Sequence, residues 1–398
     1  MAVSFLGHEL SDLCLGKPAL RSLPVSATVA DAVSALKRSG KSYVSVWTCE
    51  HSSKKKTTGF AGDDDDDCRC IGKVCMVDVL CFLCREENLK SPSKALESPV
   101  SDVLPKVPGL VKHLEPNSSL LEAIDCILEG AQNLVLPIQS HTNTKSRKKV
   151  LNKPNSFRST HHNGREFCWL TQEDVIRFLL NSIGVFSPIP TFTIESLNII
   201  DMDTMAVHYH EPASTALASI SRALTEQTSV AVIDEDNRLI GEISPITLAC
   251  CDESVAAAIT TLSAGDLMAY IDCGGPPEDL VQLVKMMLEE KNLGAMLELM
   301  EEFSVSSLSS SSSSGSSDEE CGWSSKHGGS GRYSLARTSE AIVCYPRSSL
   351  VAVMIQALTH RRNYIWVVED DYSLVGIVTF AGMLKVFRSI TGPRRKPE

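Results

Sequence analysis

The amino-acid sequence predicts an α/β chain made of four tandem copies of one small unit. Two observations support this. A proline, an amphipathic helix and two apolar strands follow one another in the same order four times along the chain. The spacing from this proline to the hydroxyl residue that ends the second strand is almost constant in the last two copies, with 32 residues from Pro212 to Ser244 and 33 from Pro346 to Thr379. Self-similarity of this kind indicates a repeat architecture.

The first two units begin at Pro24 and Pro116. After Pro24, apolar residues recur at i, i+4 and i+7, which is typical of an amphipathic helix, and a similar apolar stripe follows Pro116. The strands of these units are predicted at Tyr43–Trp47, Ile71–Cys75, Asn133–Ile138 and Phe167–Leu170.

The third and fourth units repeat this order after Pro212 and Pro346. Their helices carry the same apolar stripe, and turns separate the two strands of each unit. The strands are predicted at Ser229–Asp234, Leu239–Ile243, Tyr364–Glu369 and Leu374–Val378.

Polar segments interrupt this plan. Between the two strands of the first and second units, segments 49–70 and 139–166 are rich in Gly, Ser, Lys and Asp, and we expect mobile hairpin loops there. Such loops lengthen at little cost, because closure entropy grows only logarithmically. After the third unit, 255–303 has helical patterns. The serine-rich segment 304–335 has no apolar pattern and is expected to be a disordered tether. A substrate for an acid-directed kinase is the alternative there.

Each unit is too small to close a core alone, so adjacent units are expected to pair, first with second and third with fourth. The result is two modules. The predicted boundaries are 1–90 and 98–185 for the first two repeats, 195–254 for the third, 255–303 for the helical insertion, 304–335 for the serine-rich linker and 336–391 for the fourth repeat.

Composition narrows the classes of function. The 398 residues contain 43% hydrophobic and 22% charged residues, which is ordinary for a globular protein. The net charge of −11 argues against general affinity for nucleic acid or anionic lipid. No apolar run reaches the ~18–20 residues that span a bilayer, and no secretory signal or transit peptide is recognised. We therefore expect a soluble protein of the cytoplasm or nucleus.

The repeat plan resembles the CBS domain, named after cystathionine β-synthase. Four tandem copies resemble the γ regulatory subunits of the AMP-activated and SNF1-related kinases, and the serine-rich insertion resembles plant proteins of that group. The resemblance covers most of the chain outside the hairpin loops, the insertion and the termini. It implies CBS pairs (Bateman modules) that stack into a disk, with clefts in which an adenine nucleotide (AMP, ADP or ATP) can bind. Fold alone does not establish function.

In this family the second strand ends in Gly-h-h-Thr/Ser-x-x-Asp, where h is apolar. The hydroxyl and the acid then face one cleft, where a carboxylate can accept hydrogen bonds from both ribose hydroxyls and the helix N-terminus can hold phosphate. The resemblance implies a nucleotide site at Thr171 and Asp174, the most complete match, and a second at Asp78. The alternative for Asp174 is an acid that caps backbone amides of its helix, and for Thr171 an ordinary strand end.

The other positions of the pattern are less complete. The first repeat has Cys75 in place of the hydroxyl. The third keeps Ser244 but has Thr247 in place of the acid. The fourth keeps Thr379 but has Gly382 there, so we expect an auxiliary site at most.

Binding of the phosphate groups of a nucleotide would also require positively charged side chains. Arg361 and Arg362 precede the first strand of the fourth repeat, where family members often place phosphate-binding residues. The alternative interpretation of these two arginines is that they lie at a solvated helix end, where positive charges interact favourably with the helix dipole. His208 and His210 lead into the third repeat, and their alternative is polar surface.

The 14 cysteines are too sparse for a disulfide scaffold. We interpret them as reduced thiols that pack as small hydrophobic side chains. Metal or redox chemistry at Cys68-x-Cys70 or Cys81-x-x-Cys84 is the alternative. A zinc site needs about four ligands in spaced pairs, so no metal site is predicted.

No phosphate-cradling loop, nucleophile elbow or H-E-x-x-H helix is present, so an enzyme is not expected. Two hypotheses remain. The chain is either a regulatory subunit that senses adenine nucleotide for a protein partner, such as a kinase catalytic or scaffold subunit, or a ligand-free CBS scaffold for protein–protein interaction. No obligatory cofactor is predicted.

Overall fold

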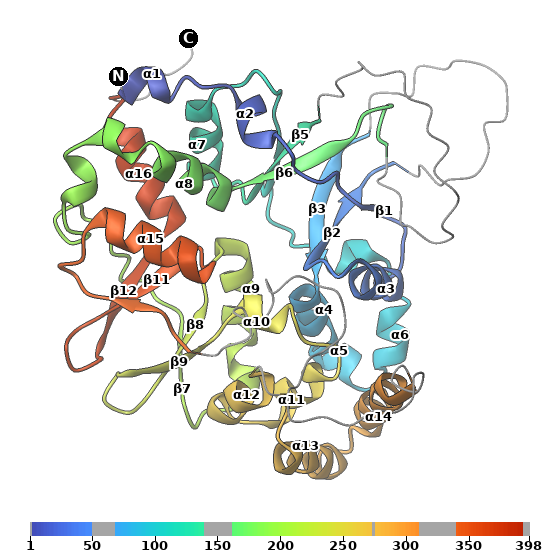
Figure 1. Ribbon diagram of the computed structural model, residues 1–398. Coiled ribbons are helices and arrows are strands. Elements are labelled where there is room, and N and C mark those ends of the chain that lie inside the picture. Colours follow the sequence, from blue (N-terminus) through green and yellow to red (C-terminus); the bar gives the residue numbers. More distant parts are fainter. Residues whose placement is uncertain (1, 50–67, 139–160, 273–274, 310–339, 393–398) are drawn as a thin grey trace, which may run out of the picture.

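A computed structural model describes residues 2–49, 68–138, 161–272, 275–309 and 340–392, with side chains up to residue 301 in the fourth range. Within these ranges the strands form four three-stranded sheets, one in each repeat. In every sheet the first strand pairs in parallel with the second, and the second pairs antiparallel with the third. The α/β fold of four tandem repeats is thereby confirmed (Figure 1).

The strands lie close to their predicted positions. In chain order they are β1 Ser22–Pro24, β2 Tyr43–Trp47, β3 Cys70–Cys75, β4 Val111–His113, β5 Asn133–Pro137, β6 Phe167–Thr171, β7 Ala206–His208, β8 Val230–Ile233, β9 Leu239–Ile243, β10 Val343–Cys344, β11 Tyr364–Val368 and β12 Leu374–Thr379.

Each repeat also contributes helices. The helices of the repeats are α3 Val29–Ser39 and α4 Met76–Leu83, α7 Leu120–Leu128 and α8 Gln172–Asn181, α9 Leu217–Glu226 and α10 Pro245–Leu248, and α15 Leu350–His360 and α16 Phe380–Ser389. The remaining ones are α1 Ala2–Phe5, α2 Leu10–Cys14, α5 Glu86–Leu89, α6 Pro92–Leu96, α11 Val255–Thr261, α12 Ala264–Ile271, α13 Glu278–Glu290, α14 Gly294–Ser309 and the 3-10 turns η2 Val100–Asp102, η3 Ile183–Phe186, η4 Ile189–Thr191 and η5 Ala213–Ala216.

Local sequence explains where the first helices start. Thr28 accepts a hydrogen bond from the Asp31 amide, and the Asp31 carboxylate accepts one from the Thr28 amide, which satisfies two backbone donors that the helix leaves unpaired. Ser119 and Ser349 cap α7 and α15 in the same way with their hydroxyl groups. Helix α3 ends at Gly40, whose φ of 57° is the left-handed conformation that glycine adopts at no steric cost.

Two kinds of interface join the repeats. The sheet of the first repeat packs on that of the second through Trp47, Val135 and Trp169. The sheets of the third and fourth repeats meet in the same manner around Ala231 and Trp366. These are the pairs that the sequence predicts.

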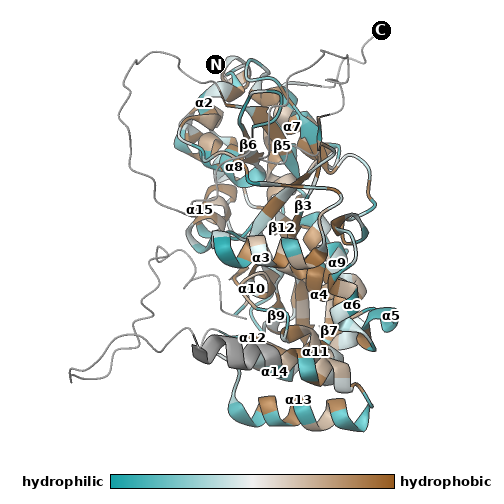
Figure 2. Cartoon of the chain, turned by 90° about the vertical axis from the view of Figure 1, so that its right-hand side faces the viewer, coloured by the Kyte–Doolittle hydropathy of each residue, from teal (hydrophilic) through white to brown (hydrophobic). Residues whose placement is uncertain are grey.

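Helices make the second kind of interface, between the modules. Helix α4 packs on α9, which joins the first repeat to the third. Helix α16 packs on α7 and α8, which joins the fourth repeat to the second. The molecule is broad in Figure 1 and narrow when turned by 90° in Figure 2, so the four repeats form one disk with alternating sheet and helix interfaces.

The insertion after the third repeat is helical, as predicted, and it extends the core of the first and third repeats. Helix α11 packs on α4, and α14 packs on α6 (Figure 1). The predicted boundary of the disordered linker was wrong at its start, because α14 continues past 303 to Ser309. Residues 310–335 lie outside the described residues, and so do 50–67 and 139–160 of the two predicted loops.

Two further segments differ from the repeat plan. The second helix of the third repeat, α10, is only four residues long, with Pro245 at its first position. The N-terminal helices α1 and α2 place Leu6 and Leu10 in the core of the second and fourth repeats, although the predicted boundary groups them with the first. Among the described residues, no helix is long and apolar enough to cross a membrane.

The linker between the modules is fixed to strand β12. Asp201 and Ile377 exchange backbone hydrogen bonds of 2.8 and 2.9 Å. Gly376 lies beside this contact, and a Cβ atom there would come within 2.5 Å of the Asp201 carbonyl oxygen and 2.8 Å of Ile200 Cγ2. Only glycine therefore fits at this position without a shift of the linker backbone.

We predict that Gly376→Ala lowers the free energy of unfolding by about 1–3 kcal/mol, because the added methyl group overpacks the contact. Equilibrium urea unfolding measures the change. Gly184→Ala is the matched control, since a Cβ atom there meets no heavy atom within 4 Å, and its cost should stay within about 0.5 kcal/mol. Equal effects of the two substitutions would contradict the prediction.

Candidate functional site

The second repeat brings Thr171 and Asp174 together at the start of α8. The Asp174 Oδ2 atom accepts hydrogen bonds from the Thr171 amide (2.8 Å) and hydroxyl (2.7 Å), and Thr171 Oγ1 accepts from the Asp174 amide (3.4 Å). This is a capping box, as the alternative interpretation expects. Lys17 Nζ lies 2.6 Å from the same Oδ2 atom. A ribose at Asp174 would therefore compete with a cation supplied by the chain itself.

In the first repeat, Asp78 is buried and caps α4. Its Oδ2 atom accepts a hydrogen bond of 2.8 Å from the Cys75 amide. Burial raises the pKa of Asp78 from its ordinary value of 3.8 to about 6, while hydrogen bonds from Cys75 and the charge of Lys73 act in the opposite direction. Asp78 lines a cavity of about 360 Å³ that also contains Arg85 and Lys106, which we call the Asp78 cavity.

In the third repeat the strand-end hydroxyl is taken by a cation of the protein. Arg362 Nη1 donates a hydrogen bond of 3.0 Å to Ser244 Oγ, and Arg362 Nη2 lies 3.4 Å from Glu242 Oε1. Both charged side chains are almost fully enclosed, with 2% of Arg362 and 1% of Glu242 exposed. Arg362 therefore lies in the interface of the third and fourth repeats. It lines neither the Asp78 cavity nor the two further cavities that are described below.

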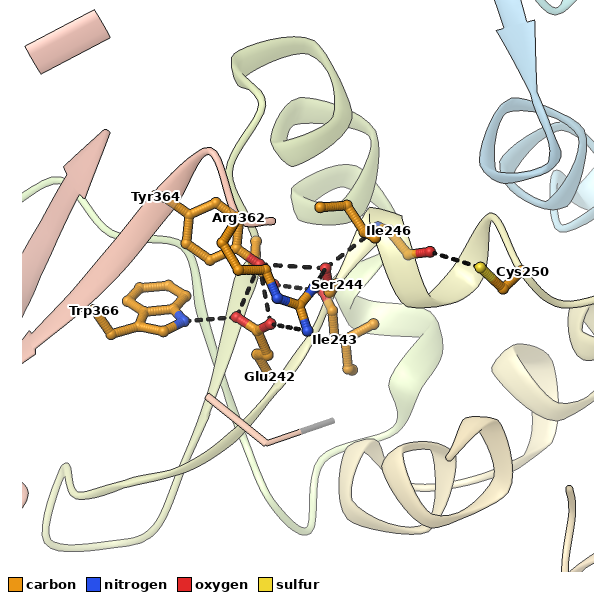
Figure 3. Close-up of polar contacts among 9 residues, drawn as sticks. Glu242, Ile243, Ser244, Ile246, Cys250, Arg362, Tyr364 and Trp366 are labelled. Carbon is orange, nitrogen blue, oxygen red and sulfur yellow. Dashed lines mark hydrogen bonds and ion pairs between the residues drawn. The ribbon is translucent and has the colours of Figure 1, made fainter. Parts of the chain in front are cut away.

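Glu242 is the acceptor at the centre of this cluster. The Tyr364 hydroxyl lies 3.0 Å from both of its oxygens, and Trp366 Nε1 donates to Oε2 at 2.7 Å (Figure 3). Burial raises the pKa of Glu242, and the Arg362 charge opposes that shift. This cluster was not predicted from the sequence. An acid within the apolar strand LIGEI was the available signal, because a charge that is buried needs a partner.

In the fourth repeat, Thr379 caps α16 by accepting a hydrogen bond of 3.1 Å from the Gly382 amide. Both residues line a cavity of about 380 Å³, the Thr379 cavity, which has Lys385 on one wall. Three acids also line it, Asp201, Asp203 and Glu226, and Arg222 pairs with the last two. Neither of the two arginines predicted to bind phosphate lines this cavity: Arg361 lines a different one, and Arg362 lies in the interface described above.

That other cavity has a volume of about 460 Å³ and receives residues from all four repeats. We call it the Lys73–Arg361 cavity. Arg361 ends α15 in the left-handed conformation with a φ of 53°, and its side chain is exposed. Lys73 Nζ lies 5.8 Å from the centre of the Tyr43 ring and 3.3 Å from Asn133 Oδ1. Burial lowers the pKa of Lys73.

The wall of this cavity contains a buried polar atom without a partner. Thr228 is 8% exposed, and its Oγ1 atom has no hydrogen-bond partner among the described residues. Thr228 lines the Lys73–Arg361 cavity and the Thr379 cavity alike. Beside it, Gln132 Nε2 donates to the carbonyl oxygens of Leu224, at 2.8 Å, and Thr225, which ties the second repeat to the third. A buried hydroxyl without a partner costs stability unless a water or ligand satisfies it.

The two candidate histidines, His208 and His210, line none of the three cavities. His208 is in β7, and its Nδ1 atom is buried without a hydrogen-bond partner among the described residues. His210 packs edge-on against the Tyr209 ring. The thiols of Cys81 and Cys84 lie in or against the helical core, where burial raises the pKa of both.

We predict that Arg362→Ala lowers the free energy of unfolding by about 3–5 kcal/mol, because Glu242 would be left buried without its cation. Arg361→Ala is the control, since it removes an identical but exposed charge from the next residue and should cost less than about 1 kcal/mol. Thermal and urea unfolding of both variants provide the comparison. If the two arginines prove equally dispensable, the buried pair does not hold this interface.

We also predict that the free energy of unfolding depends on pH because of Asp78. Because the folded-state pKa is raised, the contribution of Asp78 to stability is fully present below about pH 4 and is lost as the pH rises through about 6. The difference between the two pKa values corresponds to about 3 kcal/mol at most. Asp78→Asn should therefore gain stability relative to the wild type as the pH rises from 4.5 to 7. Urea unfolding at intermediate pH values tests this, and parallel curves would refute it.

Comparison with known proteins places the chain in a family. No protein-family model matches it. It is 49% identical over 399 residues to the CBS domain-containing protein CBSX5 of Arabidopsis thaliana, with 98% of each chain covered. Two more Arabidopsis proteins are similar, CBSX6 at 27% identity (96% of this chain, 94% of the relative) and the SNF1-related protein kinase regulatory subunit gamma-like PV42b at 22% (96% and 94%).

A solved structure supports the fold. The crystal structure of a Methanocaldococcus jannaschii protein, which has been proposed as an archaeal homologue of γ-AMPK, matches with a TM-score of 0.53 at 14% identity, over 96% of this chain and 100% of the other. The identity with CBSX5 along almost the whole chain, together with the four repeats, confirms the resemblance inferred from the sequence. The chain belongs to the family of CBS domain-containing proteins.

Proposed function

We propose that this protein is a non-catalytic regulatory subunit that binds an adenine nucleotide in the Lys73–Arg361 cavity and passes that signal to a protein partner. The observation that carries the proposal is that two cations, Lys73 and Arg361, line one cavity together with Thr228, whose buried hydroxyl has no partner among the described residues. The cavity volume of about 460 Å³ lies within the range of small-molecule sites, about 300–1,000 Å³.

The chemistry of the walls suits a phosphorylated nucleoside. Lys73 and Arg361 would hold phosphate, and Arg361 can do so through two parallel hydrogen bonds. The Tyr43 ring offers a surface on which a base can stack. The one acid in the lining, Glu173, is already paired with Arg177. The cavity therefore favours an anion.

The other candidate sites suit phosphate less well. The Thr379 cavity has three carboxylates and one lysine among its described lining residues; Arg222 pairs with two of these carboxylates, which leaves Asp201 to oppose Lys385. The Asp174 carboxylate, the first choice from the sequence, is bound to Lys17, and neither Asp174 nor Thr171 lines any of the three cavities. Asp78 lies in a neighbouring cavity with Arg85 and Lys106, and a nucleotide there is the next option.

The position of the cavity supports a regulatory role. Lys73 belongs to the first repeat, Glu173 to the second, Thr228 to the third and Arg361 to the fourth. A ligand that contacts all four would favour one arrangement of the repeats. A partner that binds that arrangement better would then bind the nucleotide-loaded protein more tightly, and the coupling would be reciprocal. The similarity to the gamma-like relative favours a kinase catalytic or scaffold subunit as the partner.

A ligand-free scaffold is the second candidate, and two contacts favour it. Arg362 occupies the hydroxyl of the third repeat, and Lys17 occupies the acid of the second. In that case the protein has replaced ligands by its own cations, and it would bind partners without sensing a metabolite.

Isothermal titration calorimetry with AMP, ADP and ATP separates these functions. We expect Arg361→Ala to weaken nucleotide binding about 10-fold or more, because it removes a charge-assisted contact with phosphate. Thr228→Val should also weaken binding, and it should stabilise the free protein because it removes an unsatisfied hydroxyl. Lys385→Ala, in the Thr379 cavity, is the control and should bind like the wild type.

Three results would count against the proposal. Equal affinity of wild type and Arg361→Ala would remove the cavity from consideration. Loss of binding in Asp174→Asn but not in Arg361→Ala would move the site to the second repeat. No heat and no change in melting temperature with any nucleotide would support the scaffold, because a ligand stabilises a protein only by binding its folded state.

A further inference from the structure

Three side chains that commonly bind metals converge near the bases of the first two hairpins. Cys49 Sγ lies 3.0 Å from Cys68 Sγ and 3.1 Å from His162 Nδ1, and Cys68 Sγ lies 3.4 Å from the same nitrogen. These ligand atoms all lie within 4.8 Å of one another. None of the three residues lines any of the three cavities, and the CBS repeat plan does not explain the cluster.

The hairpin between β2 and β3 places the two cysteines opposite each other. The Thr48 amide donates a hydrogen bond of 3.0 Å to the Arg69 carbonyl oxygen, and the Arg69 amide donates one of 3.0 Å to Thr48 Oγ1. Cys49 and Cys68 are the next residues outward from this contact, just beyond the ends of β2 and β3. Side chains that face each other across a strand pair lie close together, and here the pairing brings two sulfur atoms to the same point.

The second repeat supplies the histidine in a fixed orientation. His162 is 3% exposed and stacks on the Trp47 ring, with 3.5 Å between centroids and 6° between planes. His162 and Arg165 exchange backbone hydrogen bonds of 2.9 and 3.0 Å, which fixes the turn. His162 Nε2 lies 2.9 Å from Ser22 Oγ. A proton on Nε2 that is donated to Ser22 leaves the lone pair of Nδ1 directed at the two sulfurs, which is how metal-binding histidines are oriented.

We propose that Cys49, Cys68 and His162 form a binding site for Zn²⁺. Two thiolates and one neutral imidazole are typical zinc ligands, and two thiolates balance the charge of the ion. Both thiols lose a proton to solvent when the ion binds. With Zn–S bonds of about 2.3 Å, tetrahedral ligands lie about 3.7 Å apart, so the ion spreads these side chains by less than about 1 Å. Water or another donor takes the fourth position.

A disulfide between Cys49 and Cys68 explains less of the geometry. It would account for two sulfur atoms 3.0 Å apart, but it would not require an enclosed imidazole aimed at both of them. Packing alone also explains less of the geometry: both cysteines lie partly buried against the apolar cluster of Trp47 and Trp169, but such packing does not require both sulfur atoms to meet one imidazole nitrogen. Cys70 is buried in that cluster, and its Sγ atom donates a hydrogen bond of 3.5 Å to the Gly72 carbonyl oxygen instead.

The bound ion would fasten the first repeat to the second. Cys49 and Cys68 flank the hairpin of the first repeat, while His162 belongs to the hairpin of the second. The same face holds the sheet contact of Trp47 with Phe167. Zinc therefore adds a cross-link at the edge of an existing apolar interface, and it should stabilise the first module.

The test uses the full-length chain, reduced and freed of metal. Zn²⁺ is titrated in competition with a chromophoric chelator, and Co²⁺ is used as a spectroscopic probe of thiolate ligands. We expect one high-affinity equivalent of Zn²⁺ per chain. Cys49→Ser and Cys68→Ser should each weaken its binding at least 100-fold, and each should reduce the sulfur-to-cobalt charge-transfer absorption. Cys126→Ser, on α7, is the matched control and should change neither quantity.

A substitution outside the ligand set gives a milder test. Ser22→Ala removes the acceptor that orients His162 and should weaken Zn²⁺ binding about 10-fold. The proposal is overturned if Cys49→Ser and Cys68→Ser, folded by circular dichroism, bind Zn²⁺ like the wild type. It is equally overturned if the reduced wild type binds no Zn²⁺, whether or not mass spectrometry of the unreduced protein finds a disulfide between Cys49 and Cys68.

Discussion

Incomplete burial within each repeat is the constraint on which the rest of the structure depends. A three-stranded sheet with two helices has an apolar sheet face and apolar helix faces that one repeat cannot cover. The sheets cover each other within each module through Trp47 and Trp169 or around Trp366, and the helices cover each other between modules. Every repeat thus has two different neighbours, and the disk closes because each kind of face occurs four times.

The closed arrangement of the four repeats also determines which groups the side chains at the strand ends can contact. The third strand of each repeat is followed directly by a helix, and a hydroxyl or thiol side chain at the strand end caps that helix. The polar side chains at these strand ends have different partners in different repeats. Lys17 binds the acid of the second repeat and Arg362 the hydroxyl of the third, whereas Lys73 and Arg361 border a cavity of about 460 Å³. The available cations, more than the strand-end pattern, distinguish the sites.

The sequence predicted the fold well because local signals and global packing agree. Prolines, apolar stripes and alternating strands repeat with their spacing intact, so β2 and β9 were predicted to the residue. The sites depend on contacts between residues far apart in the chain, which such patterns do not encode. Nothing near Arg362 indicates that Glu242 will meet it 120 residues away. Likewise, Cys68 was weighed as a ligand with Cys70, its neighbour in sequence, although its partners are Cys49 and His162.

We propose that the cations of the Lys73–Arg361 cavity, and not the capping acid of the second repeat, determine where a ligand binds. A crystal structure of the full chain grown with AMP tests this most directly. We expect phosphate between Lys73 and Arg361, with the Thr228 hydroxyl satisfied by the ligand or by a water bound to it. A nucleotide whose ribose is bound to Asp174, with Lys17 displaced, would contradict it, as would an empty cavity at saturating AMP.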